Sequence, residues 1–99
     1  MAFIIPELFY LPAGETKTYY EDMSTGKNAT INILNLSPHP VELIVSSAEA
    51  EDATYTISGF NSRSLSVELL TKVELSSSAE GAAFGGLLIS SFEDAIPTI

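Results

Sequence analysis

The sequence predicts an all-β protein, a single jelly-roll or immunoglobulin-like β-sandwich of seven or eight strands with an extended N-terminal arm. Short runs of aliphatic, aromatic and β-branched residues alternate with polar residues along most of the chain, which is typical of half-buried strands. Turn residues separate these runs at intervals near the ~8–12 residues found in sandwiches. The only run with helical propensity, residues 48–52, is too short for a stable helix and is expected to be a loop.

Composition and charge exclude several classes of function. The chain has 99 residues, 45% of them hydrophobic, which suits one globular domain with one core. It contains no cysteine, so disulfide bonds and thiolate metal sites are excluded. The net charge of −9 at pH 7 argues against binding to nucleic acid or to anionic membranes. No apolar run approaches the ~20 residues of a membrane span, and the N-terminus lacks the basic region and cleavage site of a secretory signal peptide.

The first element, residues 1–11, is predicted to be an extended apolar arm. Both alternating faces of this segment are apolar, and Pro6 excludes it from a helix interior. Such an arm either completes its own sheet or adds a strand to a neighbouring subunit, and we expect the second. The arm residues expected to contact the next subunit are Phe3, Ile4, Ile5, Leu8, Phe9, Tyr10 and Leu11.

A hinge of Pro12, Ala13 and Gly14 follows the arm, so the predicted division is a connector over residues 1–14 and a sandwich domain over residues 15–99. Burial of four large side chains on one face of the arm would contribute on the order of 6–12 kcal/mol. Association costs about 4–15 kcal/mol, so the main-chain hydrogen bonds of an added strand would decide the balance. On this basis, the chain without residues 1–11 is expected to remain a folded domain that is monomeric or forms short oligomers.

The body of the chain divides into predicted strands and turns. Residues 29–36 and 41–47 both alternate apolar and polar positions, and the two prolines in residues 37–40 force a tight connection. These two strands are therefore expected to pair as a hairpin. The other predicted strands occupy residues 15–21, 54–57, 64–70, 73–77 and 83–92.

Several apolar residues lie on the strand faces opposite to the predicted core. In residues 83–92, Phe84, Leu88 and Phe92 share one parity and are expected to be core. A second apolar surface on a sandwich indicates strand ends that change faces, cover by the arm or tail of the same chain, or a contact between subunits, and we expect the last of these. The body residues assigned to that contact are Leu34, Leu36, Ile44, Leu87 and Ile89.

No constellation of residues predicts catalysis, a metal or a cofactor. His39 is the only histidine, lies between two prolines and has no evident nucleophile to serve, so it is expected to be a turn residue. The acidic residues within 48–52 lack the ligand spacing of a calcium loop. Asn28 and Asn35 begin glycosylation sequons, which are common by chance. The protein is not expected to be an enzyme.

The order of elements in residues 30–92 resembles a known family, the jelly-roll subunits of endospore appendages, which are pilus-like fibres on the spores of Gram-positive bacteria. The similar features are an Asn-x-Ser-x-x-Pro-Val turn from Asn35 to Val41, a Leu-Thr-Lys-Val-Glu-Leu step from Leu70 to Leu75, a Ser-Ser-Ser-Ala-Glu-Gly turn, and a Gly-containing strand from Ala83 to Phe92.

The resemblance implies a homopolymeric, head-to-tail helical filament on the spore surface, with a flexible N-terminal connector that links the subunits. It also implies that the subunits are made in the mother cell and reach the spore surface after lysis, without a secretory signal peptide. An anchor or tip protein is a candidate further partner of such a fibre. Family members carry cysteines that cross-link subunits. This chain would be a cysteine-free member, held together by strand addition and apolar contacts.

Two other function classes stay open. A carbohydrate-binding or adhesin module would place its ligand at the loops or at Tyr19, Tyr20 and Tyr55, and would be monomeric. A phage or virus structural protein would share the sandwich and the arm, and would close into shells or rings.

Overall fold

Seven antiparallel strands build the described part of the chain. The structure is a computed structural model, and it describes residues 3–23 and 25–91. The strands are β1 (Phe3–Leu11), β2 (Thr16–Glu21), β3 (Lys27–Asn35), β4 (Val41–Ser47), β5 (Ala53–Ile57), β6 (Ser62–Ser77) and β7 (Ala83–Ser91). The predicted all-β fold is confirmed. The described residues include no helix, and therefore none long and apolar enough to cross a membrane.

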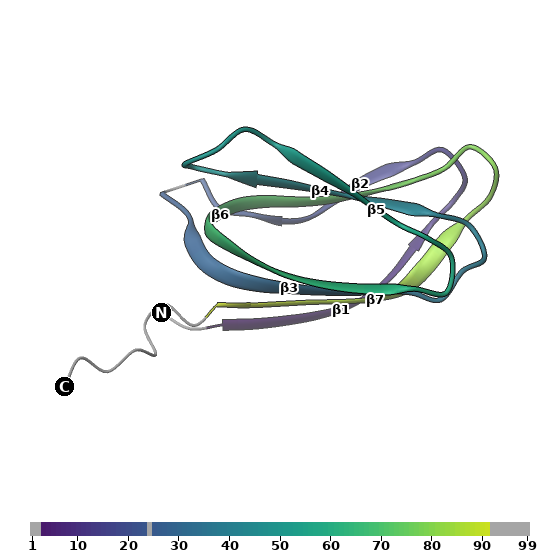
Figure 1. Cartoon of the computed structure of the whole chain (residues 1–99), viewed down its shortest axis with the longest axis horizontal. Coiled ribbons are helices and arrows are strands. Elements are labelled where there is room, and N and C mark those ends of the chain that lie inside the picture. Colours follow the sequence, from purple (N-terminus) through teal and green to yellow (C-terminus); the bar gives the residue numbers. More distant parts are fainter. Residues whose placement is uncertain (1–2, 24, 92–99) are drawn as a thin grey trace.

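One long strand divides the sheet into the two layers seen in Figure 1. The first half of β6, residues 62–70, pairs with β3, whereas residues 70–77 pair with β4 and with β2. Layer A is therefore β1-β7-β3-β6, and layer B is β5-β4-β6-β2. Two strands were predicted where β6 lies, at 64–70 and 73–77. The structure makes one strand of them.

The bend in β6 is fixed at Leu69. This residue has a left-handed backbone with φ of 54°, which an aliphatic side chain rarely adopts. Its N–H donates to Asn28 Oδ1 at 3.0 Å, and its carbonyl accepts from the Ala48 N–H at 3.0 Å. Both backbone groups of the corner are thus satisfied by other segments, which compensates for the unfavourable conformation.

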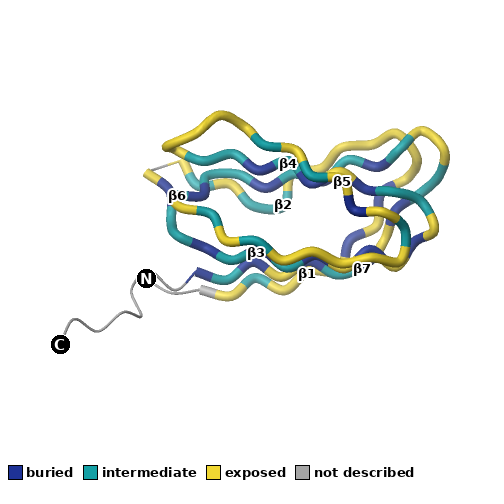
Figure 2. Tube along the Cα trace, in the orientation of Figure 1, coloured by how far each residue is buried: buried dark blue, intermediate teal, exposed yellow. Residues whose placement is uncertain are grey.

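The core lies between the two layers and takes alternate residues from each strand, as the alternation of dark blue and yellow in Figure 2 shows. Burial of these side chains supplies the main driving force for the fold. The buried hydrophobic residues are Phe9, Leu11, Ala29, Ile31, Ile33, Val41, Leu43, Val45, Ile57, Leu70, Val73, Leu75, Ala83, Leu87 and Ile89.

The predicted hairpin between residues 29–36 and 41–47 is wrong. β3 belongs to layer A and β4 to layer B, and both pair with β6 rather than with each other. The connection is a corner between layers, built around the fully buried side chains of Asn35 and Ser37. A short proline-containing connection is compatible with either geometry. The alternation of apolar residues carries no information that distinguishes them.

The arm pairs within its own chain in this structure. β1 lies antiparallel to β7 along its whole length, from Phe3 opposite Ser91 to Leu11 opposite Ala83. It is the edge strand of layer A. Exchange of the same strand between subunits is therefore a proposal, taken up below.

Candidate functional site: the apolar outer face of layer A

The most unusual surface of the molecule is the outer face of layer A. Large hydrophobic side chains cluster there, from three adjacent strands and the residue that follows β3. We call this surface the apolar face. Its large residues, with their exposed fractions, are Ile4 (69%), Leu8 (88%), Tyr10 (63%), Leu34 (44%), Leu36 (49%), Phe84 (39%) and Leu88 (37%).

Strand pairing explains why these residues meet. In one row across the sheet, Leu8 lies opposite Gly86, and Gly86 lies opposite Leu34. In the next row of outward-facing residues, Pro6 lies opposite Leu88. Side chains directly opposite on one face of an antiparallel sheet have Cβ atoms about 5 Å apart. Residues distant in the sequence thus form one continuous surface.

Aromatic rings occupy one end of the apolar face. The rings of Tyr10 and Phe84 stack with centroids 6.4 Å apart and an interplanar angle of 20°. Leu36 lies beside them, since its N–H donates to the Phe84 carbonyl at 2.9 Å. Offset-stacked rings contribute about 0.5–1.5 kcal/mol beyond their buried area, so the edge strand β1 is attached to β7 by side chains as well as by its backbone.

A hollow lies in the middle of the apolar face, above Gly86. A Cβ atom at this position would meet nothing within 4 Å. The groove above it has a volume of about 700 Å³, and its walls include Leu8, Leu34 and Leu88 from the apolar face together with Glu7 and Arg63. The surface thus combines a protruding leucine with an adjacent depression.

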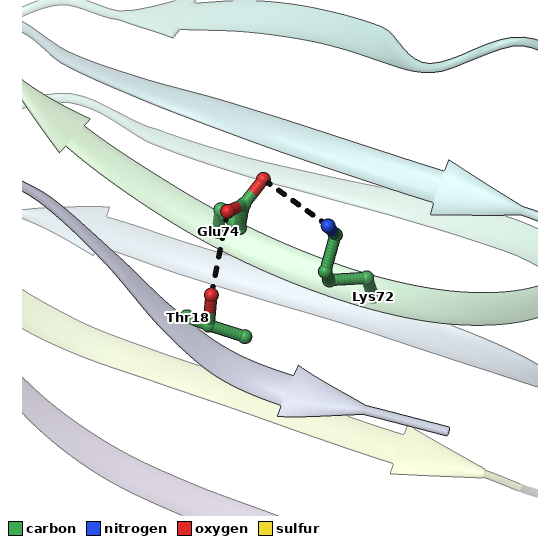
Figure 3. A network of polar contacts seen from close by, with 3 residues as sticks. All are labelled: Thr18, Lys72 and Glu74. Atoms are coloured by element: carbon green, nitrogen blue, oxygen red, sulfur yellow. Dashed lines mark hydrogen bonds and ion pairs between the residues drawn. The ribbon is translucent and has the colours of Figure 1, made fainter. Parts of the chain in front are cut away.

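The outer face of layer B has the opposite character. Figure 3 shows part of it, where Thr18 donates a hydrogen bond to Glu74 at 3.3 Å and the Lys72 ammonium lies 4.0 Å from the same carboxylate. The neighbouring outward-facing residues on β5 are Thr54 and Thr56. Layer B therefore has the polar exterior expected of a soluble sandwich. The apolar outer face of layer A departs from this expectation.

The segment 12–14 crosses from layer A to layer B at the end of β1. Gly14 has φ of 74°, a conformation for which glycine is favoured. Its N–H donates to the Ser78 carbonyl at 2.9 Å, and the Ser77 hydroxyl donates to the Pro12 carbonyl at 2.5 Å. Hydrogen bonds of this kind contribute a net ~0.5–1.5 kcal/mol each, so the predicted hinge is held closed by a few weak contacts.

Glu7 is the one charged residue of β1, and it alternates with the core residue Phe9 on the inward-facing parity of the strand. Phe9 packs edge-to-face on Tyr19 of layer B, with ring centroids 6.4 Å apart. Burial raises the pKa of the Tyr19 hydroxyl above its ordinary value, and the Glu7 carboxylate raises this pKa further. The Glu7 residue is itself exposed, and a charged residue on an edge strand disfavours uncontrolled pairing with other chains.

Replacement of Glu7 by Gln is expected to lower the pKa of Tyr19 only in part, because burial is the larger cause of the rise. A tyrosine with a raised pKa in the folded state loses its stabilising contribution as the pH rises above ~10. The E7Q variant should therefore lose less of its free energy of unfolding at alkaline pH than the unchanged protein does. NMR titration of labelled tyrosine, together with unfolding measured from pH 9 to 11, tests this. An unchanged Tyr19 pKa would contradict the assignment.

The predicted body contact divides into three groups in the structure. Leu34 and Leu36 lie on the apolar face, as predicted for an outward-facing pair. Ile44 is half-buried on the outer face of layer B, where Glu74 and Thr54 are its cross-strand neighbours. It is thus separate from the apolar face.

Leu87 and Ile89 were assigned to the wrong face. They are 3% and 0% exposed and belong to the core, while Phe84 and Leu88 point outward. The prediction took the parity with more aromatic residues as the inner one. In the structure Phe84 is held on the outer face by its stacking with Tyr10, a contact that depends on the β1–β7 register and that the pattern of β7 alone does not reveal.

The arm residues also divide by face. Ile5, Phe9 and Leu11 pack inward in layer A, whereas Ile4, Leu8 and Tyr10 lie on the apolar face. The described part of Phe3 is its backbone, which pairs with Ser91. Phe84, Gly86 and Leu88 are the functional-site residues that the sequence prediction missed.

The tyrosines considered for a sugar site are not the exposed rings. Tyr19, Tyr20 and Tyr55 are half-buried and pack against the core, and the Arg63 guanidinium lies 4.7 Å above the Tyr55 ring. Among the side chains that the structure describes, the exposed aromatic ones are Tyr10, Phe60 and Phe84. His39 packs against Gly81, where its ring occupies the space that a side chain would need. Among the described residues, no three His, Asp or Glu side chains converge as metal ligands.

Comparison with known proteins supports the fold and shows no family. No protein-family model matches the sequence, and no curated protein matches it. One similar solved structure is described as "Bacillus endospore appendages form a novel family of disulfide-linked pili", with a TM-score of 0.66 and 16% sequence identity. The match covers 90% of this chain and 84% of that chain.

A second similar structure is the capsular polysaccharide assembling protein CapF from Staphylococcus aureus, with a TM-score of 0.56 and 11% identity. The match covers 87% of this chain and 24% of that one, so this chain spans about a quarter of that protein. At sequence identities of 16% and 11%, the similarity to these two structures is evidence about the fold alone. The chain has a β-sandwich fold similar to that of a Bacillus endospore appendage subunit.

Proposed function

We propose that the protein is a self-assembling subunit of a pilus-like extracellular fibre of the endospore appendage type, in which β1 of each subunit pairs with β7 of the next. The observation that carries the proposal is the pairing of β1 itself. It is an edge strand whose only strand partner among the described residues is β7, joined to the body through residues 12–14. The likeness of the fold to an endospore appendage pilin supports the same function.

Strand exchange would conserve the contacts of β1. All nine residue pairs between β1 and β7 can form between two copies as well as within one, because the register depends only on the two strands. Opening the turn would break the hydrogen bonds that Ser77 and Ser78 make with residues 12–14, at a cost of about 1–3 kcal/mol. Each subunit that gives its strand forward and receives one from behind extends a head-to-tail filament.

A fibre of this protein would differ from the disulfide-linked pili in what joins its subunits. The chain has no cysteine, so covalent linkage through disulfides is impossible. Non-covalent strand addition and apolar contacts must then supply the whole strength of the joint. The spore surface as location, and an anchor or tip protein as partner, belong to this same proposal.

A pair of introduced cysteines, Phe3→Cys with Ser91→Cys, distinguishes pairing within a subunit from pairing between subunits. The two residues are directly opposite on β1 and β7, and the Cα separation of such pairs, about 4.5–5.5 Å, suits a disulfide. The Ser91 hydroxyl is buried and has no hydrogen-bond partner among the described residues, so its loss should be tolerated. These two would be the only thiols in the protein.

The variant is assembled under reducing conditions, inspected by negative-stain electron microscopy, and then oxidised. We expect fibres, and a ladder of covalent oligomers on a non-reducing gel. The single variant Phe3→Cys is the matched control and can give dimers at most. Fibres that yield only monomers on the gel would contradict strand exchange, and absence of fibres under all conditions would contradict the fibre itself.

A further inference from the structure

We propose that the apolar face is a docking surface for the same face of a second copy of the chain, in a two-fold symmetric contact. This inference goes beyond strand exchange and does not depend on it. Strand exchange would join subunits along a fibre, whereas the apolar faces would join subunits side by side. Three observations support a second copy as the occupant of this surface.

The first observation concerns charge. The chain carries a net charge of −9, so two copies repel each other unless they meet through an uncharged surface. Within the described strands, the outward-facing positions of β1, β7 and β3, and of residues 62–66 on β6, hold no charged side chain, and the exposed Glu68 follows them along β6. These positions are Ile4, Pro6, Leu8, Tyr10, Thr30, Asn32, Leu34, Leu36, Ser62, Ser64, Ser66, Phe84, Gly86, Leu88 and Ser90.

The outer face of layer B, by contrast, carries Glu42, Glu74 and Lys72. A second copy of so acidic a chain can approach β1, β7 and β3 through outward-facing positions that carry no carboxylate, while Glu7 lies in the wall of the groove and Glu68 lies on β6. The same approach to layer B would place acidic residues near one another.

The second observation concerns area. The exposed fraction of each of the seven large residues on the apolar face can be multiplied by the full surface area of that residue type. The total exposed area is then roughly 800 Å². This is about the area that one partner contributes to a standard specific interface. It also exceeds the largest apolar patch of a typical monomer, about 300–600 Å². Five of the seven residues lie on β1 and β7, so most of this area is available to a second copy that covers these two strands.

The third observation concerns shape. Leu8 is 88% exposed and lies directly opposite Gly86, above which the groove opens. A protrusion and a hollow of leucine size are thus neighbours in one row of the sheet. A two-fold axis along the strands, midway between β1 and β7, would place each Leu8 over the Gly86 of the other copy. A symmetric contact requires a self-complementary surface of this kind.

The test uses the oxidised Phe3→Cys/Ser91→Cys protein, purified as a monomeric chain on a non-reducing gel. The intramolecular disulfide keeps β1 on its own β7 and prevents strand exchange. Neither position belongs to the apolar face. We expect this locked protein to form dimers in sedimentation-velocity and light-scattering experiments. Failure of the fibre proposal would not affect this result, so the two proposals fail independently.

Two substitutions in the locked protein then test the surface. Gly86→Val fills the hollow without a clash, because a side chain there has open space. Leu8→Glu removes the protrusion and introduces a charge at a site that is exposed in the monomer. Each variant should raise the dimer dissociation constant tenfold or more and leave the unfolding midpoint of the monomer nearly unchanged. Thr54→Val and Thr54→Glu on the outer face of layer B are the matched controls, and they should leave dimerisation unchanged.

A locked protein that is monomeric at all concentrations would overturn the proposal, as would dimers that tolerate both substitutions. If deletion of residues 93–99 converted such a monomer into a dimer, the chain's own C-terminal residues would be the occupant of the face. The proposal would be wrong in that case also.

Discussion

Deletion of residues 1–11 is expected to leave a chain that does not fold by itself, and a synthetic peptide of residues 1–14 is expected to restore folding when it is added. The sequence alone favours the opposite result, a folded domain without its arm that is monomeric or forms short oligomers. The structure changes the expectation, because Phe9 and Leu11 are 3% and 1% exposed and belong to the central core.

The loss of folding stability on deletion of β1 is expected to be large. Truncation of a buried Phe to Ala typically costs about 3–5 kcal/mol, and truncation of a buried Leu about 2–5 kcal/mol. Domains of this size have a total stability of about 5–15 kcal/mol. Removal of β1 also leaves the backbone groups of β7 unpaired on one side, which exposes a new sheet edge to aggregation. Loss of the whole strand should therefore exceed the stability that is available.

The measurement is the far-UV circular dichroism and NMR spectrum of the truncated chain with and without the peptide. The peptide should bind with a stoichiometry of one and restore a native spectrum. A peptide with Phe9→Asp and Leu11→Asp is the matched control, and it should neither bind nor restore a native spectrum. A truncated chain that folds cooperatively without any peptide would show that β1 is an accessory to the fold, and strand exchange would then lose its driving force.

The sequence predicts the class of the fold well and the positions of faces less well. Alternation in residues 29–33 and 41–45 gives the correct inward set, since Ile31, Ile33, Leu43 and Val45 are all buried. In residues 29–33 the opposite parity is polar, and in residues 41–45 it holds Glu42 with the single apolar Ile44, so the period identifies the core in both strands. The turn residues separate the other strands correctly, but they do not show that residues 64–70 and 73–77 belong to one strand, β6.

The pattern of β7 does not identify its inner face. Both parities of this strand are apolar, and a shift of one residue exchanges the two faces. The structure decides the question through pairing, because β7 lies between β1 and β3 and its outward residues stack on theirs. The candidate site could be located from the sequence on β1 and β3, at Leu8 and Leu34, but its central strand could not.

Replacement of Asn35 by Ala is expected to destabilise the fold by at least ~3 kcal/mol, one of the largest effects of a single substitution outside the apolar core. Asn35 is the last residue of β3 and is fully buried. Its side chain connects the segments that meet at the corner between the layers. Sequence reasoning treated Asn35 only as part of a glycosylation sequon and of a turn.

The Asn35 amide forms hydrogen bonds with three carbonyl groups, one backbone N–H and one hydroxyl. Its Nδ2 donates to the carbonyls of His39 at 2.8 Å, Ile57 at 3.1 Å and Ser58 at 3.2 Å. Its Oδ1 accepts from the N–H of Ser37 at 3.0 Å and from the Ser37 hydroxyl at 2.6 Å. A buried polar group that loses its partner costs about 1–3 kcal/mol, and Asn35→Ala removes the partner of several at once.

Asn35→Asp should be more harmful than Asn35→Ala at neutral pH, because a carboxylate would face three carbonyl oxygens without a hydrogen to donate. The pKa of the introduced acid should therefore be raised in the folded state. Stability should then fall as the pH rises above the unfolded value near 4. Urea denaturation from pH 3 to 7 measures both effects.

Asn61→Ala is the matched control, because Asn61 is exposed and its side chain donates only to the Gly59 carbonyl, at 3.1 Å. It should cost less than about 1 kcal/mol and show little dependence on pH. If Asn35→Ala were as mild as this control, the turn from layer A to layer B would be held by the backbone and the prolines alone. A large difference between the two asparagines would instead place the corner, and with it the alignment of the two layers, under the control of one buried amide.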